Sequence, residues 1–223
     1  MRRLLLTLFL VLAPGLASAE LEIFACEPEW AALADEIGGD LVNSYSATTA
    51  LQDPHYIQAR PSLIAKVRKA DLVICSGAQL EIGWLPALLQ KANNPKVSPG
   101  NDGYMEASRF VMRLDATANL DRAKGDIHPQ GNPHIQTDPH NIAAVARALG
   151  ERLAKIDVVN SDIYAKNLEQ FVTKWEQAVS RWEDLAEPLR GKRAITHHKS
   201  WVYLLRWLGM EEVEHLEAIP GLP

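Results

Sequence analysis

Short apolar segments alternate with amphipathic helical segments along most of this chain, and this alternation limits the possible folds more than any other feature. Continuous apolar runs are typical of strands buried on both faces, which occur in parallel sheets covered by helices. The run Leu21–Ala25 comes first, and Pro28–Ile37 follows it with apolar residues at helical spacing. The pattern therefore predicts an α/β fold built from parallel βαβ units.

The same reasoning assigns the remaining elements. Ser62 is expected to cap the next helix, and Trp175 and Trp182 are expected to lie in the core on the apolar face of the longest helix. Further strands are expected at 41–45, 72–75, 194–196 and 213–216, with a less regular one within 96–111, and further helices at 63–69, 82–92, 141–155, 161–185 and 201–208.

The first nineteen residues have the pattern of a secretory signal peptide. Arg2 and Arg3 are followed by the apolar stretch Leu4–Leu12 and by the small-x-small sequence Ala17-Ser18-Ala19. The apolar stretch is shorter than the roughly 20 residues that span a membrane, which argues against the alternative of an N-terminal anchor. We expect cleavage after Ala19 and export of the remaining chain.

Charge and cysteine content narrow the function further. Without Arg2 and Arg3 the chain has 23 − 2 = 21 basic against 28 acidic residues, a net charge of −7. An acidic chain is a poor partner for nucleic acid or an anionic membrane. Export to an oxidising compartment favours a disulfide between Cys26 and Cys75, with two buried free thiols as the alternative.

Three of the seven histidines lie in apparent loops after strands or beside turns, namely His55, His134 and His198. Pro54 and Pro133 precede the first two and restrict their local backbone. Imidazole is a good zinc ligand, and three histidines with one further position make a common zinc site. The spacings of 79 and 64 residues carry no local motif, so three unrelated surface or capping histidines remain the alternative.

Several motifs together resemble the family of metal-binding proteins that serve ABC importers of zinc and manganese, the cluster A-I substrate-binding proteins. The tyrosine five residues after the third ligand selects His198 rather than His197 as the family's ligand. The motifs that carry the resemblance are Asp53-Pro54-His55-Tyr56, Arg60-Pro61-Ser62, Ala70-Asp71-Leu72-Val73, Gly77-Ala78-Gln79-Leu80-Glu81 with Trp84-Leu85, Asn132-Pro133-His134-Ile135-Gln136-Thr137-Asp138-Pro139, His198-Lys199-Ser200-Trp201-Val202-Tyr203 and Pro220-Gly221-Leu222-Pro223.

The resemblance implies two lobes of parallel βα units joined by a long rigid helix. We then expect a signal peptide at 1–19, an N-terminal metal-binding lobe at 20–158, a linking helix at 159–187 and the start of a C-terminal lobe at 188–223. Family members continue well past the last motif, and the added part supplies a fourth ligand, usually a carboxylate. We therefore expect a C-terminally truncated chain whose fourth ligand would lie beyond Pro223.

The resemblance also implies a function. His55, His134 and His198 would bind Zn²⁺ in the periplasm for delivery to an ABC transporter permease, with a periplasmic metal chaperone as a further partner. We expect a monomer, no catalysis and no nucleic-acid partner. Zinc is expected ahead of manganese because imidazole suits zinc and carboxylate suits manganese.

Two alternatives stay open, a manganese-binding homologue and a zinc-dependent hydrolase. Three histidines with an open position could activate water, although the sequence has no HExxH motif and no evident general base. An adhesin role, sometimes attached to the family, has no separate support in the residues. The roles of three further residues are also open. His128 either pre-binds metal or is simply exposed, and His197 is either a neighbour of the third ligand or that ligand itself. Glu81 either orients a ligand or is a carboxylate at a helix start.

Overall fold

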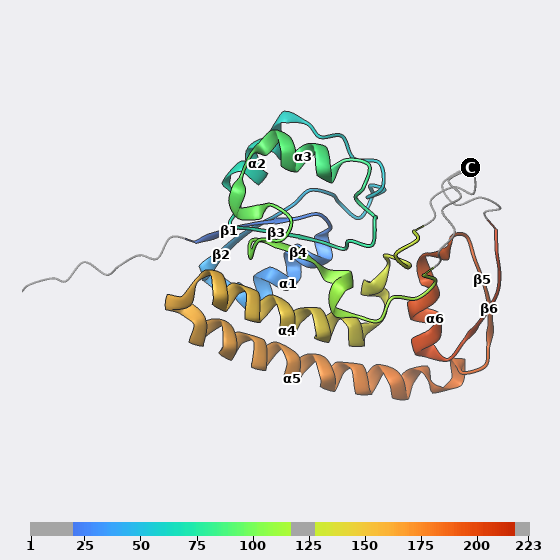
Figure 1. Ribbon diagram of the computed structural model, residues 1–223. Coiled ribbons are helices and arrows are strands. Elements are labelled where there is room, and N and C mark those ends of the chain that lie inside the picture. The colour runs from blue at the N-terminus through green and yellow to red at the C-terminus, as the bar shows by residue number, and fades with distance from the viewer. Residues whose placement is uncertain (1–19, 117–127, 217–223) are drawn as a thin grey trace, which may run out of the picture.

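A four-stranded, all-parallel sheet lies at the centre of the larger part of the chain (Figure 1). The computed structural model describes residues 20–116 and 128–216. The strand order is β2-β1-β3-β4, and the α/β fold expected from the sequence is confirmed. The strands are β1 (Leu21–Ala25), β2 (Val42–Ser46), β3 (Leu72–Cys75) and β4 (Tyr104–Glu106).

The central strands β1 and β3 are apolar at almost every position because both of their faces are covered. Ile23 and Ile74 point into one hydrophobic core, and Phe24 and Val73 point into the other. Successive side chains on a strand face opposite sides of the sheet, so each strand contributes to both cores in alternation. This is why the apolar run itself, rather than an alternating pattern, predicted these strands at their observed bounds.

Helices cover both faces of the sheet. The first core contains residues of α1 (Pro28–Gly38), α4 (Pro139–Ile156) and α5 (Ser161–Ala186). The second contains residues of α2 (Pro61–Lys69) and α3 (Leu85–Ala92), as the two sides of the sheet in Figure 1 show. The sheet is therefore the middle layer of three, and its strand ends are the places where loops from both sides meet.

Four helix starts, those of α2, α3, α4 and α6 (Val202–Leu208), differ by one to three residues from the expected ones, and the first two show why. Ser62 does not cap α2, because the helix begins one residue earlier at Pro61 and Arg60 occupies the capping position without a side-chain hydrogen bond. Proline suits the first turn of a helix because it has no N–H to leave unsatisfied. The segment before Leu85 is a turn instead of helix, with left-handed backbone at Gly77, Ala78 and Gln79.

The long helix α5 lies along α4 and leads to a second, smaller sheet at the far end of the molecule (Figure 1). That sheet pairs two parallel strands, β5 (Arg193–Thr196) and β6 (Glu211–His215), across α6 (Val202–Leu208). The expectation that Trp182 lies in the core is wrong: 39% of its surface is exposed, because the C-terminal part of α5 runs past the sheet. Trp175 is only partly buried, and its Nε1–H donates to the carbonyl of Pro139 at 2.7 Å.

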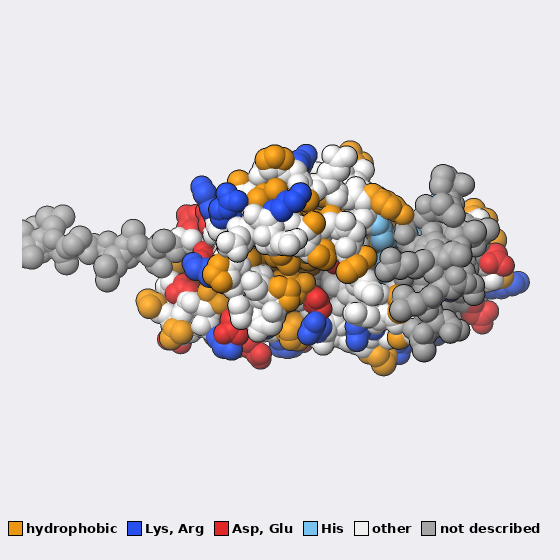
Figure 2. All heavy atoms as spheres, turned by 45° about the horizontal axis from the view of Figure 1, so that its top comes forward, with side chains coloured by type: hydrophobic (Ala, Val, Ile, Leu, Met, Phe, Trp, Pro, Cys, Tyr) orange, Lys and Arg blue, Asp and Glu red, His pale blue; other side chains and the backbone are white. Residues whose placement is uncertain are grey.

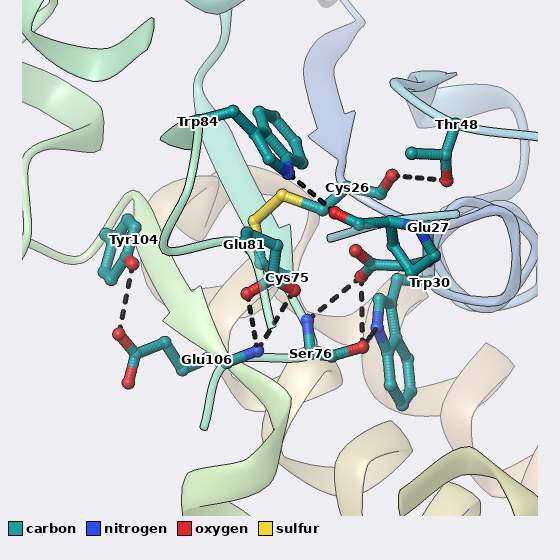
Figure 3. The surroundings of a disulfide bond; sticks show 12 residues. Cys26, Glu27, Trp30, Thr48, Cys75, Ser76, Glu81, Trp84, Tyr104 and Glu106 are labelled. Atoms are coloured by element: carbon teal, nitrogen blue, oxygen red, sulfur yellow. Dashed lines mark hydrogen bonds between the residues drawn. A yellow bond between two sulfur atoms is a disulfide. The ribbon is translucent and has the colours of Figure 1, made fainter. Parts of the chain in front are cut away.

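A disulfide joins the ends of the two central strands, as Figure 3 shows. Cys26 directly follows β1 and Cys75 ends β3, and their Cα atoms are 4.8 Å apart. Both cysteines are fully buried in the second core. The predicted disulfide is confirmed, and it fixes the edge of the sheet from which the loop carrying His55 departs.

Two predicted segments lie outside the described residues. The signal-peptide segment, residues 1–19, is one, and the motif at 220–223 is the other. Within the described residues, no helix combines the length and the apolar character needed to cross a membrane.

Candidate metal centre

The three histidines singled out by the sequence converge in space. His55 lies in the loop after β2, His134 lies just before α4, and His198 follows β5. The ring centroids of His55 and His134 are 6.1 Å apart, and those of His134 and His198 are 6.0 Å apart. Figure 2 shows histidine side chains reaching the surface on one face of the molecule. Segments that are 79 and 64 residues apart in sequence thus present imidazoles to one point.

His55 is oriented by Asp53, two residues earlier. The Asp53 carboxylate accepts the His55 backbone N–H at 3.0 Å and lies 2.6 Å from the ring Nδ1. A histidine that donates Nδ1–H to a carboxylate presents a bare Nε2 to a metal, the arrangement common in zinc sites. Burial would raise the pKa of Asp53, but the hydrogen bonds from His55 outweigh it and hold that pKa below its usual value.

We predict that Asp53→Asn lowers metal affinity about 10- to 100-fold, the range for losing such an orienting partner. The amide keeps the size of the side chain but removes the charge that favours the Nδ1–H form of His55. A competitive zinc titration measures the effect. The matched control is Asp71→Asn. The carboxylate of Asp71 pairs with Lys96 at 2.7 Å and does not contact the histidines, so this change should leave the metal affinity unchanged. Equal affinity of the Asp53 variant and the wild type would show that Asp53 does not orient a ligand.

The turn that precedes α3 packs against the loop that carries His55 and stabilises it. Trp84 donates its indole N–H to the carbonyl of Pro54 at 2.8 Å. Glu81, in the same turn, accepts the backbone N–H of Gly77 at 3.2 Å. Glu81 therefore acts on the loop that carries His55 through the backbone of its own turn.

Glu81 lies beside a second buried carboxyl, that of Glu27 (Figure 3). Glu27 accepts the backbone N–H and the hydroxyl of Ser76 at 3.1 and 3.0 Å. Burial raises the pKa of Glu81 to about 7, and burial together with the charge of Glu81 raises the pKa of Glu27 well above its usual value. These groups brace the ends of β1 and β3 beneath the loop.

His134 has a ring nitrogen sealed from solvent. Its Nε2 is buried and has no hydrogen-bond partner among the residues that the structure describes. Leaving such a group unsatisfied costs roughly 1–3 kcal/mol, so a bound ion is a natural partner for it. Burial lowers the pKa of His134 to about 3, and the nearby His55, His198 and His128 lower it as well, so the ring is neutral and able to bind a metal at physiological pH.

Asn132 ties the His134 and His198 loops together. Its side-chain oxygen accepts the His134 backbone N–H at 3.0 Å, and its amide donates to the carbonyl of Lys199 at 2.7 Å. The hydroxyl of Tyr203 donates to the Asn132 carbonyl at 2.8 Å and accepts the backbone N–H of Leu114 at 3.0 Å. Tyr203, five residues after His198, thus stabilises the loop that carries His134 through these two hydrogen bonds.

A fourth histidine joins the cluster. The ring of His128 lies 5.2 Å from that of His55, and the two Nε2 atoms are 3.1 Å apart. The sequence left the role of His128 open, and its position six residues before His134 gives no sign of the contact with His55.

Two further histidines lie outside the cluster. His197 is exposed, whereas the neighbouring His198 is partly buried against His134. His140 is the second residue of α4 and pairs with Glu183 at 2.9 Å. Neither Asp53 nor Asn132 was among the predicted site residues, although both stand two residues before a candidate ligand, a position from which a short polar side chain commonly accepts a backbone N–H.

The cluster is suited to a small cation that accepts nitrogen ligands. For a tetrahedral zinc site with Zn–N bonds of about 2.0–2.1 Å, neighbouring ring centroids would stand about 5 Å apart. The 6.0 and 6.1 Å separations are somewhat wider, so binding an ion would draw the rings together. Within the described part of the chain, the one group of three or more metal-ligating side chains whose donor atoms all lie within 4.8 Å is Cys26, Cys75 and Glu81, and the disulfide occupies both sulfurs. The donor atoms of the three histidines are therefore spread more widely than that in the metal-free protein.

Comparison with known proteins identifies the family of the chain. Residues 23–220 match the family model described as "ZnuA: Zinc-uptake complex component A periplasmic". The metal ABC transporter substrate-binding lipoprotein ScbA of Streptococcus cristatus is 28% identical over 160 residues, which cover 70% of this chain and 48% of that protein. The manganese ABC transporter substrate-binding lipoprotein PsaA of Streptococcus mitis is 24% identical over 196 residues, 86% of this chain and 60% of that protein. The chain thus spans about half the length of the curated relatives it matches.

Solved structures share the fold. A crystal structure of ZnuA superimposes with a TM-score of 0.72 at 23% identity, covering 87% of this chain and 70% of the other. A Mn-bound mutant of the periplasmic metal binding protein from candidatus liberibacter asiaticus gives 0.71 at 17% identity, covering 87% and 68%. Zn(II)-bound AdcA from Streptococcus pneumoniae gives 0.70 at 18% identity, covering 88% and 39%.

Proposed function

The chain belongs to the ZnuA family of periplasmic zinc-uptake components, and from that premise we propose that it captures a divalent metal ion outside the cytoplasm for an ABC-type importer. The observation that carries the proposal is the convergence of His55, His134 and His198, with His134 Nε2 buried and, within 20–116 and 128–216, without a hydrogen-bond partner. Each ring stands in a loop whose backbone is fixed by hydrogen bonds. Such preorganisation lowers the cost of ordering ligands around an ion.

Zinc is the ion that we propose. Relatives are named for manganese as well as zinc, so family membership leaves the choice open. The histidine donors favour zinc, because imidazole suits zinc while manganese prefers carboxylate and water oxygens. Asp53, a carboxylate close to the rings, is already engaged by His55 Nδ1.

The organisation and the partners are also proposals. Residues 20–158 would form the metal-binding lobe, 159–187 the linking helix and 188–223 the start of a second lobe. The ion would pass to a membrane permease, with a metal chaperone as donor, and the protein would act as a periplasmic monomer after cleavage at Ala19. No catalytic step is needed, and Asp53, being held by His55, is poorly placed to serve as the general base of a hydrolase.

The test is a competitive titration of the purified protein with Zn²⁺ and Mn²⁺ against a chromophoric chelator. We expect one zinc ion per chain, binding at least about 100-fold more tightly than manganese, because nitrogen ligands favour zinc. His55→Ala and His198→Ala should each weaken zinc binding about 100-fold or more, since each removes one of a few ligands that share the binding free energy.

The matched control is His197→Ala, which removes an exposed imidazole one residue from His198. Its affinity should equal that of the wild type. Zinc binding that survives the changes at both His55 and His198 would overturn the site, and tighter manganese than zinc binding would overturn the choice of ion.

A further inference from the structure

His128 occupies a defined place beside His55. The carbonyl of His128 accepts the backbone N–H of Gly131 at 2.9 Å, which closes a turn. The next residue, Asn132, donates its backbone N–H to the carbonyl of Leu114 at 2.7 Å and also holds His134. One short segment, 128–134, therefore carries two of the histidines whose rings lie beside that of His55.

The spacing of His55 and His128 matches that of two ligands on one ion. In a tetrahedral zinc site with Zn–N bonds of about 2.05 Å, adjacent nitrogens stand about 3.3 Å apart and ring centroids about 5.2 Å apart. The observed values are 3.1 Å between the Nε2 atoms and 5.2 Å between the centroids. Of the three ring pairs measured in the cluster, this pair is the closest to the spacing that zinc requires.

We infer that His128 is the fourth metal ligand of this chain, through Nε2, completing an all-imidazole set with His55, His134 and His198. The inference rests on the proposed metal-binding function and deepens it, because it names a further ligand of the same site. Four neutral imidazoles form a site of the kind that zinc accepts and that manganese binds weakly.

The proton balance is simple. With Asp53 accepting Nδ1–H of His55, the bare Nε2 of His55 accepts N–H from Nε2 of His128 in the metal-free protein. On binding Zn²⁺, His128 releases its Nε2 proton to water and takes one at Nδ1, so the ring stays neutral and no net proton is lost. Both Nε2 lone pairs then face the ion in place of the hydrogen bond.

The experiment compares His128→Ala with His140→Ala in the whole chain. His140 is a matched control because it is also a histidine near a short turn, but it pairs with Glu183 on α5. We expect His128→Ala to lower zinc affinity about 10- to 100-fold in a chelator competition, less than the loss at a more buried ligand. The control variant should bind as the wild type does.

Two further readouts separate a ligand from a neighbour. Zinc X-ray absorption should give four imidazole nitrogens in the wild type and three in His128→Ala, with an oxygen in the vacated position. The Co²⁺-loaded protein should show the strong visible absorption of a four-coordinate nitrogen site, altered in the variant. Free imidazole added to His128→Gly should restore part of the lost affinity.

The outcomes distinguish this inference from the proposed function. If His128→Ala binds zinc within twofold of the wild type and keeps four nitrogens, while His55→Ala loses binding, then His128 is only a hydrogen-bond partner of His55 and the metal-binding function stands. If neither variant weakens zinc binding, the proposed function fails as well. Thermal unfolding of the metal-free variants checks that each has folded.

Discussion

Replacing His134 with leucine should abolish high-affinity zinc binding and at the same time make the metal-free protein more resistant to acid. His134 contributes an Nε2 atom that is buried without a hydrogen-bond partner in the described part of the chain, and its ring lies beside those of His55 and His198. Losing one such ligand should weaken zinc binding about 100-fold or more. Leucine has a similar size and leaves no unsatisfied buried nitrogen.

The acid effect follows from the direction of the pKa shift. The pKa of His134 is about 3 in the folded protein and near 6.5 in an unfolded chain. Between those values the unfolded state binds more protons than the folded state, so the stability of the metal-free protein falls as pH drops from about 6.5 towards 3. His134→Leu removes this contribution.

The measurement is urea unfolding at pH 7 and pH 4.5 in the presence of a chelator. The loss of unfolding free energy between the two pH values should be smaller in His134→Leu than in the wild type. His140→Leu, at an exposed histidine, is the control and should retain the wild-type loss. An equally steep loss in both variants would show that His134 is not the ring whose protonation destabilises the fold.

Removing the disulfide should destabilise the protein by about 4 kcal/mol, which is the chain-entropy cost of opening a loop of this size. The bond closes a loop between residues 49 positions apart and joins the ends of β1 and β3. The comparison is Cys26→Ala/Cys75→Ala against the oxidised wild type in urea unfolding. The double variant leaves no thiol to form incorrect pairs, since the structure records no free cysteine among the described residues.

Reduction of the wild type provides the control for side-chain packing. Reduced wild type keeps both buried sulfur atoms, so its loss of stability reports the cross-link alone, and the double variant should lose slightly more. A difference of less than about 1 kcal/mol between oxidised and reduced wild type would contradict a stabilising role for the cross-link.

The predictions from sequence were accurate where local chemistry decides. The bounds of β1 and β3 were correct because β3 is a continuous apolar run between Asp71 and Ser76, and β1 is apolar except for Glu22. Helix starts were less accurate: at α2 the choice between Ser62 and Pro61 depends on how the preceding loop enters the helix. The burial of Trp182 was wrong because helical periodicity does not show where a helix runs past its sheet.

Some features of the candidate site could likewise be predicted from the sequence, and others could not. Motifs around His55, His134 and His198 identified these residues, and the rule that loops at the carboxyl ends of parallel strands form sites agrees with the place of His55. The role of Asp53 depends on a two-residue spacing, so it could have been predicted from the local sequence. The contact between His55 and His128 could not have been predicted in this way, because 73 residues separate them.

The sequence by itself determined the parallel α/β fold, the disulfide partners and the three histidines with family motifs, because each depends on residue type and local spacing. Only the tertiary structure decided that His128 lies 3.1 Å from His55, that Asn132 links two of the histidine loops, and that His134 Nε2 is sealed from solvent. The physical reason is that distances between distant segments are set by how helices pack on the sheet, and no local pattern encodes that packing.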